Sequence, residues 1–175
     1  MAIPLPHRLH SDHPQPAVAA TPPTAFLSQD ELKCVAAHRA VELVESGMVL
    51  GMGTGSTAAH ALDRIGELLR CDVLSILTSE WATGRVAAAG IPLVDLNTHP
   101  IVDLSIDIAD EVDPALYLVK GRGGSLLREK MVEGASHRFV VIVDEYKIVS
   151  RLGASGLTVP VEVIPFGWVL SLRRL

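Results

Sequence analysis

The chain has 175 residues, of which 49% are hydrophobic and 20% are charged. This length suits one domain, or one domain with a small appendage, and the composition excludes disorder of the whole chain. Lys and Arg total 15 against 20 Asp and Glu, for a formal charge of −5, and no basic stripe indicates a nucleic-acid partner. The longest apolar stretches, such as 139–143, are far too short to span a bilayer.

The N-terminal segment differs from the rest in composition. Residues 1–24 contain six prolines and no apolar periodicity, which predicts a disordered, Pro-rich tail over 1–27. The tail has no continuous apolar core of a secretory signal and little of the Ser and Arg of a transit peptide. We therefore expect a cytoplasmic protein, with an organelle such as the plastid as the alternative.

Histidine and cysteine give no metal site. His7, His10 and His13 are three apart, but the surrounding prolines disfavour the helix that would gather them. Cys34 and Cys71 lack a CxxC spacing and are interpreted as reduced packing residues.

The first half of the chain alternates helix and strand patterns. Ser28 and Glu31 form a capping box that predicts the start of a helix over 29–46. The pattern then predicts, in order, a strand over 48–52, a turn over 53–56, a helix over 57–70, a strand over 73–77 and a helix over 81–89.

The second half continues the alternation. Short strands are expected over 91–94, 101–106, 116–119, 139–143 and 161–164, with a helix over 125–133. The alternation predicts an α/β fold with an open, mostly parallel, Rossmann-like sheet and helices on both faces. In such folds ligands bind outside the carboxyl ends of the strands.

Three loops follow predicted strands at that end. The run 51–57 (GMGTGST) leads from a strand into a helix, where glycine N–H groups, hydroxyls and the helix N-terminus suit one phosphate. It lacks the P-loop Gly-Lys-Ser/Thr and the G-x-G-x-x-G pattern, so a nucleotide-binding module has little support. A purely structural strand-to-helix turn remains the alternative for this loop.

The other two loops carry charge. Asp107, Asp110 and Glu111 crowd three carboxylates into five positions, which favours shifted pKa values and acid–base chemistry, although a solvated acidic loop has the same pattern. Lys120 stands among glycines and could offset charge on a substrate oxygen. Glu129 follows on the next helix, where a plain surface helix is the alternative. Together the loops indicate proton transfer on a small phosphorylated substrate.

These segments together resemble the type A ribose-5-phosphate isomerase family, close to its plant members. The resemblance covers about 29–166 and rests on the following segments in the same order: QDELK (29–33), GMVLGMGTGSTAAHA (47–61), GIPLVDLNTHPIVDLSIDIADEVDP (90–114), LVKGRGGSLLREKM (118–131) and VPVEVIPF (159–166).

The resemblance implies an isomerase of the pentose phosphate pathway that interconverts D-ribose 5-phosphate and D-ribulose 5-phosphate through an enediolate. It implies no cofactor and no metal, a small sugar phosphate as substrate, a homo-oligomer, and neither nucleic acid nor membrane as partner. By motif position, Glu129 matches the catalytic base, Asp107 the assisting acid, Asp110 the aspartate linked to ring opening, and Lys120 the lysine that stabilises the oxyanion.

The resemblance also implies a substrate-binding set. Its members lie on the first predicted helix and in the two glycine-rich loops: Lys33, Gly53, Thr54, Gly55, Ser56, Thr57, Gly121, Gly123 and Gly124.

Two departures from the family pattern bear on function. Ile108 stands where the family has glycine, so a positive φ at this position would be strained and would shift both flanking aspartates. The isomerase core is expected over 28–166 and a divergent end over 167–175, with the family's C-terminal α+β lid region largely missing. The alternative function is therefore an impaired, truncated isoform that only binds sugar phosphate or associates with full-length subunits.

Overall fold

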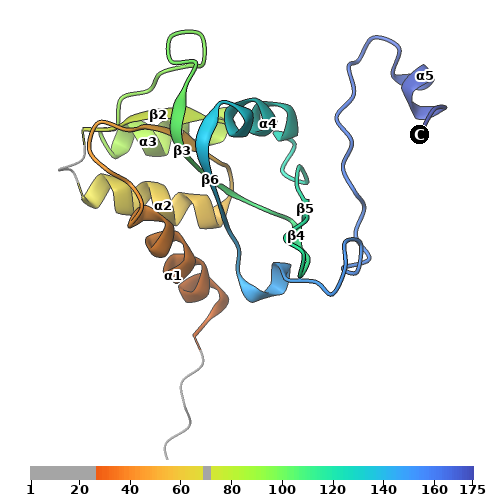
Figure 1. Cartoon of the computed structure of the whole chain (residues 1–175), viewed down its shortest axis with the longest axis horizontal. Coiled ribbons are helices and arrows are strands. Elements are labelled where there is room, and N and C mark those ends of the chain that lie inside the picture. The colour runs from red at the N-terminus through yellow and green to blue at the C-terminus, as the bar shows by residue number, and fades with distance from the viewer. Residues whose placement is uncertain (1–26, 69–71) are drawn as a thin grey trace, which may run out of the picture.

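The computed structural model describes residues 27–68 and 72–175, and a parallel β-sheet forms its centre (Figure 1). All strand pairs of the sheet are parallel. In spatial order its strands are β2 (Leu74–Leu77), β1 (Val49–Met52), β3 (Val102–Ile108) and β6 (Ser136–Ile142). The predicted open parallel sheet is confirmed.

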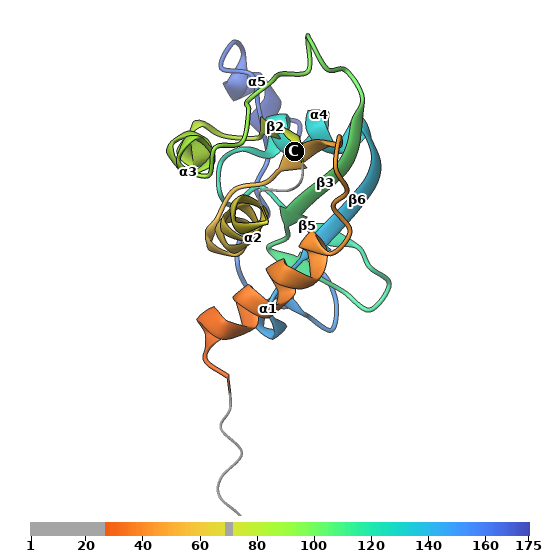
Figure 2. The ribbon, with the colours of Figure 1, turned by 90° about the vertical axis from the view of Figure 1, so that its left-hand side faces the viewer.

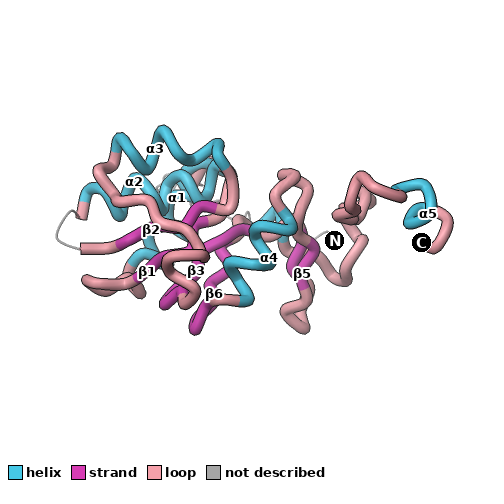
Figure 3. Tube along the Cα trace, turned by 90° about the horizontal axis from the view of Figure 1, so that it is seen from above, coloured by secondary structure: helices cyan, strands magenta, loops and turns pink. Residues whose placement is uncertain are grey.

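Helices cover both faces of this sheet. On one face lie α1 (Gln29–Val41), α2 (Ser56–Glu67) and α3 (Thr83–Ala88), stacked side by side in Figures 2 and 3. The opposite face is covered by α4 (Leu126–Gly134), which packs on β3 and β6. A 3-10 turn, η1 (Glu80–Ala82), precedes α3, and another, η2 (Glu145–Lys147), follows β6.

The core explains why these segments became strands. Leu50, Met52, Leu104 and Ile106 are at most 1% exposed and pack beneath α1 and α2. Val102, at the start of β3, packs in a second, smaller cluster with Ile76 and with Val132 of α4. The sequence of β3, VDLSIDI, alternates apolar and polar residues, so Leu104 and Ile106 pack in the core while the small, buried Ser105 lies near Val132 of α4.

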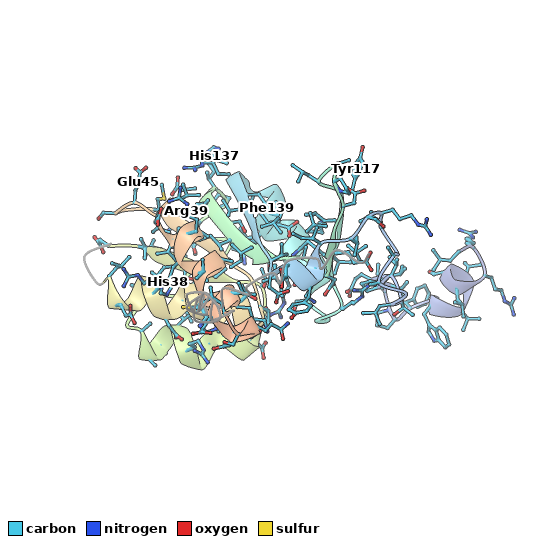
Figure 4. All side chains as sticks on the ribbon, turned by 90° about the horizontal axis from the view of Figure 1, so that it is seen from below. His38, Arg39, Glu45, Tyr117, His137 and Phe139 are labelled. Carbon is cyan, nitrogen blue, oxygen red and sulfur yellow. The ribbon has the colours of Figure 1, made fainter. Side chains whose placement is uncertain are left out.

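A two-stranded antiparallel hairpin follows β3. It pairs β4 (Glu111–Val112) with β5 (Leu118–Val119) and carries the exposed Tyr117 at its tip (Figure 4). The hairpin reverses the chain, so Lys120 returns to the end of β3 from which Asp107 projects.

One edge of the main sheet is formed by β6, which pairs only with β3 among the described residues. Its first half is exposed, and Figure 4 shows His137 and Phe139 on this strand at the outer side of the sheet. Beyond residue 150 the chain runs away from the sheet to α5 (Trp168–Leu172), a short helix without buried residues.

Several predicted boundaries were wrong. The first helix ends at Val41 rather than 46, where the chain continues in turns. The strand expected over 91–94 is reduced to a single bridge between Ser75 and Leu93. The strand expected over 161–164 does not form, because none of the described strands lies beside it to pair with it and Pro160 and Pro165 offer no N–H.

Two predictions fall outside the described residues, namely the Pro-rich tail over 1–27, except for its last residue, and the environment of Cys71. Among the helices that are described, none combines the length and apolarity needed to cross a membrane.

Candidate functional site

The loops singled out in the sequence gather at the carboxyl ends of the parallel strands. The chain leaves β1 in one direction toward β2, whereas β3 lies on the other side of β1, so a topological switch point falls between β1 and β3. Open α/β sheets bind ligands at this position. Gly53 and Asp107 face each other there, directly after β1 and near the end of β3.

The centre of the site is the ammonium group of Lys120. Its Nζ lies 3.0 Å from Oδ2 of Asp107 and 3.4 Å from Oε2 of Glu129. A third carboxylate, from Glu133, places Oε1 at 3.3 Å. The same Nζ donates a hydrogen bond to the backbone carbonyl of Ile108. All four side chains are at most 7% exposed, so their charges are little screened by water.

Burial and mutual repulsion change the acidity of these groups. Burial raises the pKa of the Asp107 carboxyl, and the nearby Lys120 ammonium only partly offsets this. Burial, followed by the charge of Asp107, also raises the pKa of the Glu129 carboxyl. For Lys120, burial works against the charged form, but Asp107, Glu129 and Glu133 outweigh it and raise the pKa of the ammonium. The cluster thus combines carboxylates that are stronger bases than usual with a lysine ammonium that stays charged.

Gly53 is required by the position of Asp107. A Cβ at residue 53 would lie 1.8 Å from Oδ1 and 2.8 Å from Cα of Asp107, so no side chain fits there without moving that strand. Oδ1 accepts a hydrogen bond of 2.7 Å from the N–H of Ile108. The glycine loop therefore fixes the carboxylate against β1.

The N-terminus of α2 opens onto a cavity of about 260 Å³ beside this cluster. Gly55 caps the helix with φ at 116°, a conformation that favours glycine. The lining combines the helix start with two lysines from other elements: Lys33 of α1, Gly55, Ser56, Thr57, and Lys147 of η2. Asp144 also lines it, with its carboxylate accepting from the N–H of Tyr146. Hydroxyls, lysines and a helix N-terminus together suit a phosphate group.

Ile108 links the cavity to the cluster, because its side chain lines the former and its carbonyl receives the Lys120 ammonium. The backbone strain that a positive φ would cause at this residue does not arise. Ile108 is the last residue of β3, and Leu116 is the described non-glycine residue with a positive φ. A β-branched residue suits an extended strand end.

A row of hydroxyls borders the site on the side of β2. Thr54 Oγ1 donates to Ser79 Oγ at 2.7 Å and lies 3.1 Å from Thr78 Oγ1. Thr78 and Ser79 also line a second cavity, of about 340 Å³, together with Gly124 and Arg128. This polar wall lies between the glycine-rich loop and the start of α4.

Asp110 is not part of the Lys120 cluster. Its Oδ2 accepts a hydrogen bond of 2.9 Å from the N–H of Arg122, so it fastens the loop that carries Gly121, Gly123 and Gly124. Gly121 and Gly124 have positive φ values and close a turn through a 2.9 Å bond between them.

Glu111 anchors the same loop through hydrogen bonds of its carboxylate. It is fully buried, and Arg122 donates to its Oε1 at 2.9 Å. Oε1 also accepts from the Ser155 hydroxyl, and Oε2 accepts from the N–H of Gly153 at 2.6 Å. These hydrogen bonds, above all those from Ser155 and Arg122, lower the pKa of Glu111 to about 2. The carboxylate therefore ties residues 153–155 to the Lys120 loop.

Sequence reasoning missed two residues, Glu133 and Lys147. Glu133 lies one helical turn after Glu129 and so projects from the same face of α4, a spacing that could have revealed it. Lys147 follows the end of β6, which is the same kind of strand-end position as the other loops.

The carboxylates also resemble a metal site in outline. Ligand oxygens of Asp107, Glu129 and Glu133 lie within 4.8 Å of one another. The Lys120 ammonium, however, already lies within 3.4 Å of all three, so the positive charge at their centre belongs to the protein itself.

Comparison with known proteins gives a consistent family. Residues 74–175 match the family model for ribose 5-phosphate isomerase A (phosphoriboisomerase A). The chain is 64% identical over 154 residues to probable ribose-5-phosphate isomerase 1 of Arabidopsis thaliana, covering 86% of this chain and 58% of the relative. It is 60% identical over 163 residues to probable ribose-5-phosphate isomerase 2 of the same plant, covering 90% and 62%.

Solved structures agree. A D-ribose-5-phosphate isomerase in complex with phospho-erythronic acid matches with a TM-score of 0.80 at 38% identity, over 85% of this chain and 66% of the other. Ribose 5-phosphate isomerase A from Methanocaldococcus jannaschii matches with a TM-score of 0.78 at 42% identity, over 84% and 66%. The chain thus spans about three fifths of the length of its plant relatives.

The contact between Gly53 and Asp107 predicts a large effect of one added methyl group. Gly53→Ala should lower the free energy of unfolding by about 1–3 kcal/mol, because the new Cβ overlaps Asp107. Gly123→Ala is the matched control, since a Cβ there meets nothing within 4 Å and its φ is not positive. Urea unfolding of both variants checks this, and equal midpoints for the two would contradict the geometry.

The Glu111 network predicts a pH-dependent stability. A carboxyl whose pKa falls from 4.5 to about 2 on folding stabilises the protein above pH 4.5, and this contribution is lost as the pH falls toward 2. Glu111→Gln should therefore lower stability most at pH 6 and progressively less at pH 4 and pH 3. Denaturant unfolding at the three values checks this, with Glu45→Gln, an exposed carboxylate, as control. A loss independent of pH would show that the charge of Glu111 is not what stabilises the fold.

Proposed function

Because the chain belongs to the ribose 5-phosphate isomerase A family, we propose that it interconverts D-ribose 5-phosphate and D-ribulose 5-phosphate by proton transfer. The observation that carries the proposal is the position of Lys120, whose ammonium lies between the buried carboxylates of Asp107 and Glu129. A base and a fixed positive charge at this distance are what enediolate formation requires.

Each group has one task in this reaction. Glu129 removes the proton from C2 of the open-chain aldose, and the electron pair forms the C1–C2 double bond of an enediolate. Lys120 stabilises the negative charge that develops on the oxygens. Asp107, whose pKa is raised, supplies a proton to O1 and takes one from O2. Glu129 then returns its proton to C1, which yields the ketose.

The phosphate would occupy the cavity at the N-terminus of α2. Lys33, Ser56, Thr57 and Lys147 supply the donors and charge there, and Gly53, Thr54 and Gly55 shape the approach. Gly121, Gly123 and Gly124 shape the opposite loop beside Lys120, where Asp110 is assigned to ring opening. The phospho-erythronic acid held by a solved relative is in keeping with such a ligand.

We also propose a cellular compartment and an oligomeric state for this enzyme. We expect it to work in the cytoplasm, with the plastid as the alternative, since one relative from Arabidopsis thaliana is named chloroplastic. A homo-oligomer is expected, and the open edge of β6 leaves a strand available for pairing with another copy.

Ketose formation from ribose 5-phosphate by the purified chain tests the function directly. Glu129→Gln should reduce kcat by about 100-fold or more, because general-base catalysis typically contributes that much. Glu67→Gln, which neutralises an exposed carboxylate at the far end of α2, should keep the wild-type rate.

A wild-type rate no higher than that of Glu129→Gln would overturn the enzymatic proposal. Thermal stabilisation by ribose 5-phosphate without turnover would then favour the alternative, a chain that only binds sugar phosphate.

A further inference from the structure

The Lys120 cluster contains one carboxylate more than the proposed reaction uses. Asp107 and Glu129 have tasks in proton transfer, whereas Glu133 has none, yet its Oε1 lies 3.3 Å from the same ammonium and its side chain is only 7% exposed. Burying a third carboxylate is costly unless its charge is compensated. Its presence therefore needs a physical account.

The contacts of Glu133 separate its two oxygens. Oε2 faces outward and lies 2.9 Å from the ammonium of Lys130, an exposed residue of the same helix. Oε1 faces inward, toward Lys120, and within the described part of the chain it accepts no hydrogen bond. Glu133 thus connects the solvent-exposed Lys130 with the buried Lys120.

Three charged side chains act on the carboxyl group of Glu129. Asp107 comes from β3, Lys120 follows β5, and Glu133 comes from the same helix one turn later. β6 also packs on α4, but none of its charged residues forms an ion pair with α4 in the parts of the chain that are described. Glu133 is therefore the neighbour of the proposed base that has no other assigned task.

From this geometry we infer that Glu133 is a positioning residue, which holds the Lys120 ammonium beside Glu129 and keeps Glu129 a stronger base than two carboxylates alone would. The inference rests on the proposed isomerase function. Oδ2 of Asp107 and Oε2 of Glu129 likewise accept no hydrogen bond from any described residue, so three carboxylates compete for one ammonium. A proton is consequently held more tightly on the cluster than on a simple ion pair.

The consequence for Glu129 has a definite sign. The negative charge of Glu133 contributes to raising the pKa of the Glu129 carboxyl, after the larger effects of burial and Asp107. The acid limb of kcat/KM reports the base of the free enzyme. Removing the charge of Glu133 should therefore move this limb to lower pH, while lowering the rate at neutral pH because Lys120 is held less firmly.

Glu133→Gln, which keeps the size of the side chain, tests the inference through the pH profile of ribose 5-phosphate isomerisation. We expect the acid limb to shift downward by about half a unit to one unit, a threefold to tenfold change in proton concentration, with kcat reduced and KM nearly unchanged. Glu133→Asp should recover part of the wild-type profile. Glu67→Gln is the matched control and should leave the profile unchanged. An unshifted acid limb in Glu133→Gln would overturn the inference.

A second measurement separates this inference from the isomerase proposal. NMR titration of 13C-labelled carboxyl groups in the free chain gives the pKa of Glu129 without turnover, with Glu129→Gln identifying its signal. Glu133→Gln should lower that pKa even if the chain shows no isomerase activity, in which case only the proposed function fails. An unchanged Glu129 pKa would overturn the role of Glu133, whatever the activity.

Discussion

The candidate site depends on one buried ammonium surrounded by carboxylates. Lys120 lies within 3.4 Å of Asp107, Glu129 and Glu133, and it is the cation shared by all three. Without it Asp107 and Glu129 would be buried charges with no cationic partner in the described part of the chain, which proteins avoid by taking up protons or unfolding. The same arrangement that makes the cluster stable makes it chemically useful, because it combines raised carboxyl pKa values with a fixed positive charge.

The fold brings these groups together from distant parts of the chain. Asp107 comes from the end of the central strand β3, Lys120 returns through the β4–β5 hairpin, and Glu129 follows on α4. Gly53 lets β1 approach Asp107 closely, and Glu111 fastens the Lys120 loop through Arg122. Ile108 then joins the cluster to the cavity at the start of α2, so that the buried charges around Lys120 and the hydroxyls and lysines of the cavity lie side by side.

Sequence patterns predicted the elements that depend on local spacing and missed those that depend on partners. The apolar residues of β3, the capping box at Ser28 and the glycine turn before α2 follow from local chemistry, and all three elements are present. The segment 161–164 has the same apolar character, but a strand also needs a neighbour, which sequence spacing does not reveal. The prediction that Lys120 and Glu129 lie close together is confirmed. Asp110, in contrast, lies apart from them and accepts a hydrogen bond from the N–H of Arg122. Ile108 would be strained only at a positive φ, a condition that residue type cannot reveal and that its place at the end of β3 removes.

The pH dependence of stability in Lys120→Met tests most directly whether the ammonium compensates the carboxylates. The variant should be destabilised by about 3–5 kcal/mol at neutral pH, as expected when one partner of a buried charge cluster is removed. Because the folded-state pKa values of Asp107 and Glu129 then rise further above their unfolded values, stability should recover as the pH is lowered from 8 to 5. Arg39→Met, which removes an exposed cation outside the cluster, serves as control. A stability deficit of Lys120→Met that shrinks as the pH falls from 8 to 5 would support the compensating role of the ammonium. A deficit that stays constant or grows on acidification would contradict it.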